Sequence, residues 1–112
     1  MNKLIKNIEH SQPMTLANQV PYEKGKVVSL TLAQQPGVGI TIFSFDADEG
    51  ISTHAAPGDA MIYILEGEAQ ITIADTDYKV CAGETIIMPA GIPHGVKAIT
   101  AFKMLLTVVK NP

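Results

Sequence analysis

The sequence predicts an all-β fold, either a sandwich or a closed barrel of roughly eight to ten short strands. After residue 20, apolar residues recur at two-residue spacing, as expected for strands that bury one face. Gly, Pro and Asp interrupt these runs at short intervals, which is typical of turns between strands. At 112 residues the chain has the length of one domain with one core.

The composition indicates a folded domain and excludes several kinds of partner. The chain is 46% hydrophobic and 17% charged, unlike a disordered segment. Its net charge is -3 and its eight basic residues are scattered, so nucleic acid is not expected as a partner. No apolar stretch is long enough for a membrane span or has the form of a signal peptide. With Cys81 as the single cysteine, we expect a cytoplasmic protein without a membrane partner.

The expected strands follow from the apolar, β-branched runs. Residues 27–33 and 38–45 are separated by a loop that contains Pro36 and Gly37, which predicts strand, turn, strand. Residues 61–65 and 70–74 flank Gly67, which predicts an antiparallel hairpin. The other expected strands are residues 78–81, 85–88, 94–100 and 102–109. The last of these is apolar enough that we expect cover on both of its faces.

The first twenty residues form an arm that leads into a barrel domain at residues 21–112. Residues 3–10 could be a short helical turn or an extended arm. Residues 14–16 could add an edge strand, which might pair with a partner subunit. No linker or low-complexity segment predicts a second domain.

Two segments that begin with glycine contain two of the three histidines. The second segment has Gly83, five residues, Pro89, one residue, Gly91, two residues and His94. The first segment runs from Gly50 through His54 to Gly67. These segments resemble the two motifs of the cupin superfamily: the second motif matches at every position, and the first matches at Gly50, His54 and Gly67.

The resemblance implies a small double-stranded β-helix, a jelly-roll barrel of the cupin type. In that family a His-x-His pair, a Glu and a third His hold a divalent metal, because residues two apart on a strand share a face. Here Ala56 stands near the second His position and Ala60 stands at the Glu position, so two of the four ligands are missing. Asp59 is a substitute only if a bulge turns it inward, and we expect it to be a turn or cap residue.

His54 and His94 are the main candidate site residues. We expect both imidazoles to line one pocket, where they could bind a polar ligand, ligate a metal or move a proton. The alternative is two separate histidines whose rings bond to the backbone. A divalent Zn, Ni, Mn or Fe ion could bind both, with Asp59 as a weak third ligand, although two imidazoles alone hold a cation poorly. The residues expected to line the pocket are His54, His94, Ala56, Ala60, Ile62 and Met88.

Other polar and flexible side chains have simpler expected roles. His10 is expected on the surface, and Tyr63 is expected to face opposite to its neighbours and to pack in a core or between subunits. Met88 and Met104 are expected to fill the barrel wall. Lys103 is expected to extend its ammonium group from the barrel rim into solvent.

The predicted function is the binding of a small polar or carboxylated molecule between the two histidines by a homodimeric barrel. One alternative is a metal-dependent enzyme, a dioxygenase or an isomerase or epimerase, whose shell is completed by water and substrate. A further alternative is an inert structural or partner-binding barrel in which Ile62, Ile64 and Met88 fill the cavity. The sequence assigns no catalytic residue.

Overall fold

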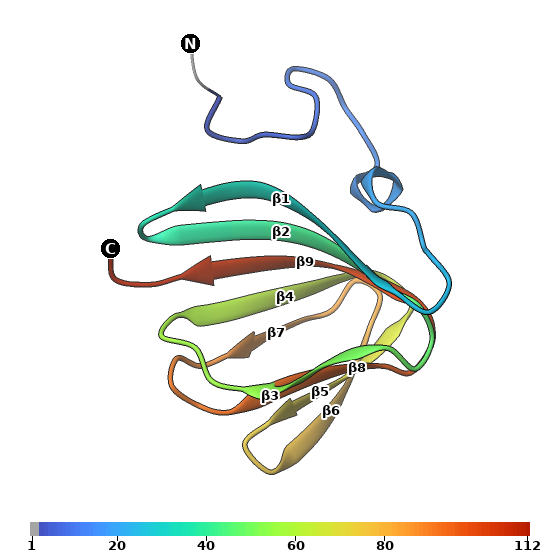
Figure 1. The fold of residues 1–112 in the computed structure, drawn as a ribbon, viewed down its shortest axis with the longest axis vertical. Coiled ribbons are helices and arrows are strands. Elements are labelled where there is room, and N and C mark those ends of the chain that lie inside the picture. The colour runs from blue at the N-terminus through green and yellow to red at the C-terminus, as the bar shows by residue number, and fades with distance from the viewer. Residues whose placement is uncertain (1–2) are drawn as a thin grey trace.

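The computed structural model describes residues 3–112 and folds them into two antiparallel sheets that face each other (Figure 1). The five-stranded sheet has the order β1-β2-β9-β4-β7, and the four-stranded sheet has the order β3-β8-β5-β6. The strands are β1 (Val27–Gln35), β2 (Val38–Phe45), β3 (Gly50–His54), β4 (Asp59–Glu66), β5 (Glu68–Ile73), β6 (Thr76–Cys81), β7 (Thr85–Met88), β8 (His94–Ala98) and β9 (Phe102–Val109). This arrangement confirms the all-β jelly-roll barrel.

The main core lies between the two sheets. On β4, Ile62 and Ile64 alternate with exposed residues and have no solvent-exposed surface. The Phe45 ring of β2 stacks on the Phe102 ring of β9 with 4.5 Å between their centroids. From the four-stranded sheet, Ile71 and neighbouring apolar residues complete the same cluster. Period-two burial therefore decides which face of each strand is internal.

The hairpin predicted around Gly67 is wrong. Strand β4 pairs with β7 and β9, whereas β5 pairs with β6 and β8, so the chain passes from one sheet to the other at this glycine. Gly67 has a φ of +80°, and a side chain there would run into the backbone of Ala101 and Phe102. Two consecutive apolar runs look like a hairpin in sequence, but partners distant in the chain decide the pairing. The other expected strand, turn, strand unit is confirmed by the β1–β2 pairing.

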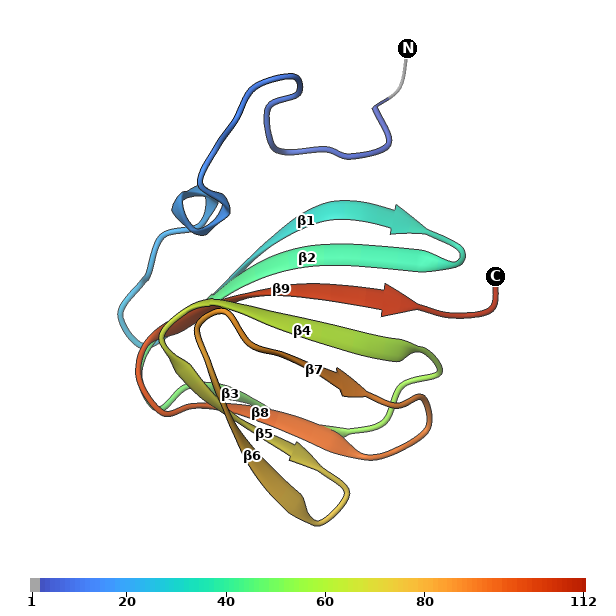
Figure 2. The same cartoon turned by 180° about the vertical axis from the view of Figure 1, so that it is seen from behind.

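The N-terminal segment contains neither the helical turn considered for residues 3–10 nor the edge strand considered for residues 14–16. Residues 3–10 contain no helix, and the helical turn is instead a short 3-10 helix, η1 (Leu16–Gln19). An edge strand at residues 14–16 is not formed, since Leu16 already belongs to that helix. Figures 1 and 2 show the segment running outside the barrel, beyond β1. Within residues 3–112 no helix has the length and apolar character needed to cross a membrane.

A second, smaller core forms on the outer face of the five-stranded sheet. Val20 is buried there with Leu32 of β1 and Ile42 of β2. Ser44 of β2 donates a hydrogen bond to the carbonyl of Pro21 at 2.6 Å, which fixes the chain that follows η1. We call residues 15–22 the strap, because they cover part of this outer face.

The expectation that Lys103 reaches solvent is wrong. The residue is 6% exposed, and its Nζ atom donates to the carbonyl of Ala17 in the strap at 2.6 Å. The Nζ atom also lies 3.6 Å from the Glu66 carboxylate and 4.6 Å from the centre of the Tyr22 ring. Burial and the Glu66 carboxylate raise the pKa of Tyr22. Because the strap supplies a carbonyl and a ring face, the ammonium can be buried with partners.

Replacement of Gly67 by alanine is expected to destabilise the barrel strongly. The added methyl group would meet the Ala101 backbone, whereas at Gly83, which has a similar φ of +85°, it would meet nothing within 4 Å. Gly83→Ala should therefore cost about 1 to 2 kcal/mol for the left-handed backbone alone. Gly67→Ala should cost at least about 2 kcal/mol more, because the core must also shift. Urea unfolding of both variants measures the difference, and equal losses would contradict it.

Lys103→Ala is expected to lower the free energy of unfolding by about 2 kcal/mol, because a buried hydrogen bond and side-chain packing are lost. Lys79→Ala is the matched control. Lys79 lies 3.6 Å from the Glu68 carboxylate, the same distance as in the Lys103 pair, but its side chain is 61% exposed. A surface pair of this kind contributes less than about 1 kcal/mol. Chemical denaturation measures the loss in free energy of unfolding of each variant, which should be larger for Lys103→Ala. Amide hydrogen exchange in the strap should become faster only in Lys103→Ala.

Candidate functional site

His54 and His94 lie in contact at one end of the four-stranded sheet. They are direct cross-strand partners in the pairing of β3 with β8. Their ring centroids are 4.5 Å apart and the ring planes meet at 67°, an edge-to-face arrangement. The two Gly-led segments of the sequence therefore bring their histidines to one place.

A β-bulge in β3 gives His54 its inward direction. Ile51 packs against the main core, so strict alternation would turn a residue three positions later to the outer face. The pairing of β3 with β8 shifts register between Ile51 and His54, and the intervening residues take up the difference. The sequence carries no clear signal for this bulge, because it depends on where β8 lies.

His94 is placed by a stiff loop that is tied to the chain after His54. The loop precedes β8 and contains Pro89 and Pro93. Its Gly91 N–H donates to the Ala56 carbonyl at 2.8 Å, and its Ala90 N–H donates to the Asp59 carboxylate at 2.8 Å. These bonds join the two loops that carry the histidines, so the relative position of the rings is fixed by backbone contacts.

The hydrogen bonds of the rings define which nitrogen carries the proton. The Nδ1 atom of His54 lies 3.0 Å from the Ser52 carbonyl, and that of His94 lies 3.1 Å from the Ile92 carbonyl. A carbonyl oxygen only accepts, so each Nδ1 donates, and in the neutral ring Nε2 is left as an acceptor. Within residues 3–112 no protein group bonds to either Nε2 atom. Both acceptors therefore remain for a ligand.

The two rings differ in burial. His94 is 3% exposed, whereas His54 is exposed. No buried side-chain nitrogen or oxygen among the described residues lacks a hydrogen-bond partner, so the Nε2 atom of His94 keeps contact with the outside. A molecule at the pair would meet His54 first and the edge of His94 behind it.

The apolar residues expected around the pair lie in or beside the main core. Ala60 and Met88 are direct partners across β4 and β7, and both are buried. Ile62 has no exposed surface, while Ala56 is half-buried in the loop that follows His54. The first three belong to the main core. Their role as ligand contacts stays a prediction.

Two surface hollows lie among the described residues. A hollow of about 320 Å³ lies on the outer face of the four-stranded sheet, and its lining includes Gln70, Thr72 and Lys97. A larger hollow of about 970 Å³ lies beside the N-terminal segment. Neither hollow is lined by His54 or His94.

The donor set does not by itself fit a resident divalent metal ion. Within residues 3–112 no group of three or more His, Cys, Asp or Glu side chains is placed to hold one. Asp59 stands beside buried Ala60 on β4 and its carboxylate caps the loop at Ala90. This is the turn or cap role expected for it. Two imidazoles are fewer than the three or four protein ligands that hold a metal ion in most sites.

The remaining candidates lie away from the pair. His10 is exposed, with its Nε2 atom 2.7 Å from the Ile5 carbonyl. Tyr63 faces opposite to Ile62 and Ile64, as expected, but it is 42% exposed and belongs to neither core. Met88 and Met104 fill the barrel interior as predicted.

Comparison with known proteins agrees with this architecture. The family model described as the cupin domain matches residues 41–110. A solved structure of a conserved protein of unknown function from Streptococcus pyogenes is 48% identical, with a TM-score of 0.97 over 99% of this chain and 97% of that one. A cupin superfamily protein from Desulfitobacterium hafniense is 32% identical, with a TM-score of 0.91 over 96% of this chain and 98% of that one.

A third solved relative is longer than this chain. A cupin 2 conserved barrel domain protein from Leptotrichia buccalis is 42% identical, with a TM-score of 0.83, and the match covers 85% of this chain but 46% of that one. No curated protein matches the chain. The two glycine-led motifs, the two-sheet barrel and the family match agree, and the chain belongs to the cupin family.

Proposed function

We propose that the barrel binds a small polar or carboxylated molecule at the pair formed by His54 and His94. The observation that carries the proposal is the contact of the two rings together with the engagement of both Nδ1 atoms by backbone carbonyls. The Nε2 atoms of two rings in contact then have no protein partner among the described residues. A hydroxyl or N–H group of a ligand can donate to them.

The charge of the site supports a carboxylated ligand. The two family ligand positions at Ala56 and Ala60 carry no charge, and the Asp59 carboxylate is engaged with the Ala90 N–H. A proton taken up by one imidazole would convert its Nε2 from acceptor to donor. A carboxylate could then accept a charge-assisted hydrogen bond from that ring, which is stronger than a neutral one. Ligand binding and proton uptake are therefore coupled in this proposal.

Small hydroxy- and keto-carboxylates are the first ligands to screen, by ring-proton and ring-carbon NMR of the histidines. His54→Ala and His94→Ala should each weaken the binding of a hit by about tenfold or more, since each removes one ligand hydrogen bond. His10→Ala is the matched control, because His10 is exposed and outside the pair. Equal affinity of all three variants, or no hit at all across the screen, would count against the proposal.

Calorimetry should detect the coupled proton. The observed enthalpy of binding a carboxylate near neutral pH is expected to vary with the ionisation enthalpy of the buffer, because the protein takes up a proton with the ligand. A plot of the observed binding enthalpy against the ionisation enthalpy of the buffer should have the slope expected for proton uptake. This slope should vanish in His94→Ala or His54→Ala. Binding with no buffer dependence would exclude the imidazolium as the carboxylate partner.

A metal-dependent activity, of the dioxygenase or isomerase and epimerase kind, is the competing proposal. One observation favours it: a histidine that ligates a metal commonly donates its other ring N–H to a backbone carbonyl, as both rings do here. Residues 3–112 supply only two such donors, so water and substrate would have to complete the shell, and we derive no catalytic step from it.

Metal titration separates the two proposals. With two protein ligands, Zn²⁺ or Ni²⁺ is expected to bind weakly and to be lost on buffer exchange, as followed by native mass spectrometry. Retention of one metal ion per chain that disappears in His54→Ala and His94→Ala, but persists in His10→Ala, would favour the metal-dependent enzyme. In that case Asp59→Ala shows whether the Asp59 carboxylate is a further ligand of the metal ion.

A further inference from the structure

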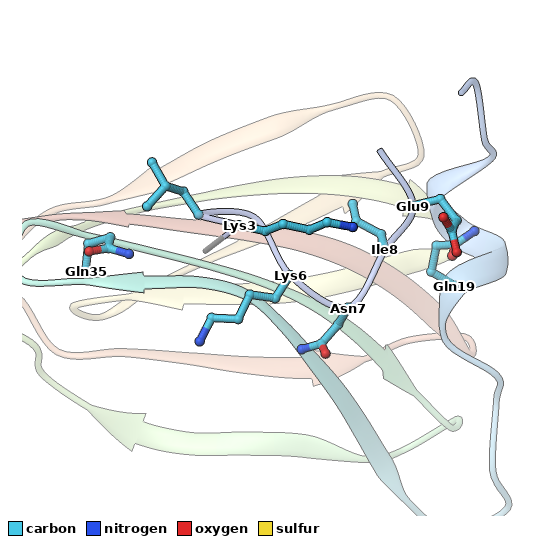
Figure 3. A pocket seen from close by; sticks show the side chains of 8 residues that line it. Lys3, Lys6, Asn7, Ile8, Glu9, Gln19 and Gln35 are labelled. Atoms are coloured by element: carbon cyan, nitrogen blue, oxygen red, sulfur yellow. The ribbon is translucent and has the colours of Figure 1, made fainter. Parts of the chain in front are cut away.

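The smaller of the two surface hollows, about 320 Å³, lies on the outer face of the four-stranded sheet. Its base is paired strand, because β8 pairs with β3 on one side and with β5 on the other. The larger hollow is bounded mainly by side chains of the N-terminal segment, and Figure 3 shows Lys3 and Lys6 pointing in different directions there. The smaller hollow therefore holds its lining on a rigid support, as a binding site requires.

Two glycines make room for this hollow. Gly50 of β3 and Gly95 of β8 face outward, since the residues that follow them, Ile51 and Val96, pack in the main core. A Cβ atom added at Gly95 would lie 3.2 Å from the hydroxyl oxygen of Thr53. The β3 bulge thus brings the Thr53 hydroxyl over the glycine, and the sheet surface is recessed where longer side chains would otherwise stand.

Polar side chains surround this recess in register. Lys97 of β8 is the direct cross-strand partner of Gly50 on one side and of Gln70 of β5 on the other. Two residues along β5, Thr72 is the partner of Gly95. We call the recess the outer hollow; the residues that line it with polar side chains are Asp48, Ser52, Thr53, Gln70, Thr72 and Lys97.

The hydrogen-bonding groups of the outer hollow are mixed in kind. The Thr72 hydroxyl donates to the Asp77 carboxylate at 2.7 Å, so it can only accept a hydrogen bond from a ligand. The Gln70 amide and the hydroxyls of Ser52 and Thr53 can both donate and accept. A ligand that carries only acceptors, such as a carboxylate or a phosphate, would use part of this set.

The charges of the outer hollow balance each other. Lys97 contributes an ammonium group and Asp48 a carboxylate, and both residues are exposed. Within residues 3–112 Lys97 forms no ion pair, whereas Lys79 in the same cross-strand row lies 3.6 Å from the Glu68 carboxylate. An anion would be attracted by Lys97 but repelled by Asp48. A ligand without net charge meets no such repulsion and can still accept hydrogen bonds from the ammonium group.

We propose that the outer hollow is a second binding site and that its ligands are neutral polyhydroxylated molecules of the saccharide class. Each hydroxyl of a sugar both donates and accepts, which matches a lining of one donor, Lys97, one acceptor, Thr72, and several groups that do both. The two glycines let a sugar ring approach the strand backbone closely. Because the contacts are hydrogen bonds on an exposed sheet face, the expected dissociation constants are millimolar.

Nuclear magnetic resonance titration of the full chain with D-glucose, D-galactose and maltose tests the proposal. With at least one sugar, the side-chain amide signals of Gln70 and the methyl signals of Thr53 and Thr72 should shift and saturate. The methyl signals of Ile73 are the internal control, because Ile73 packs against the main core and is the cross-strand partner of His94. Shifts confined to Ile73 would indicate binding at the histidine pair and would overturn the assignment to the outer hollow.

Lys97→Ala should weaken sugar binding about fivefold or more, since it removes the ammonium donor. Lys79→Ala is the matched control, because Lys79 is also a cross-strand partner of Gln70 but does not line the hollow. If Lys97→Ala fails to fold, Gln70→Ala replaces it. Equal losses in the Lys97 and Lys79 variants, or no saturable shift with any of the three sugars, overturn the proposal. So does saturation by inorganic phosphate or glycine alone, which would assign the hollow to anions or zwitterions.

Discussion

Burial of two apolar sheet faces against each other is the constraint on which the rest of the structure depends. The side chains of Ile62 and Ile64 meet Ile71 and Val96 from the opposite sheet, and the stacked rings of Phe45 and Phe102 close one end. A close-packed interior leaves each strand one allowed register, because a slip of one residue would turn its apolar side chains to the outside. The position of each functional side chain follows from that register.

The histidine pair is a consequence of this packing at the edge of the core. Strand β8 is anchored by Val96 and Ala98, which places His94 inward at the start of the strand. Strand β3 is anchored by Ile51, and the bulge that follows turns His54 toward the same side. Both Nδ1 atoms bond to carbonyls two residues earlier in the chain. The pair is thus preorganised by backbone contacts and needs no ligand to bring the rings together.

The outer face of the five-stranded sheet shows how a polar group can be built into an apolar contact. Lys103 is the second residue of the largely apolar strand β9 and is buried only because the strap supplies the Ala17 carbonyl and the Tyr22 ring. Glu66 adds an opposite charge at 3.6 Å. The strap therefore does more than cover Leu32 and Ile42: it also provides the partners without which a buried ammonium would be costly. The same sheet face is left bare where the strap ends.

The sequence by itself determined the fold family, the two histidines and every strand except β3. Apolar runs and the turn residues between them located β2, β7 and β9 at their observed bounds, since both are local properties of the chain. The glycine and proline spacing before His94 identified the second motif. Local pattern also predicted that Tyr63 faces away from its neighbours, because adjacent residues on a strand point to opposite sides.

Only the tertiary structure decided which strands pair, how His54 turns and where Lys103 goes. The runs on either side of Gly67 join different sheets because their hydrogen-bond partners lie far along the chain. The bulge before His54 is defined by the pairing of β3 with β8. The burial of Lys103 depends on its hydrogen bond to the carbonyl of Ala17, which lies 86 residues away. Such features depend on contacts between segments distant in sequence, and no local pattern of residue types encodes them.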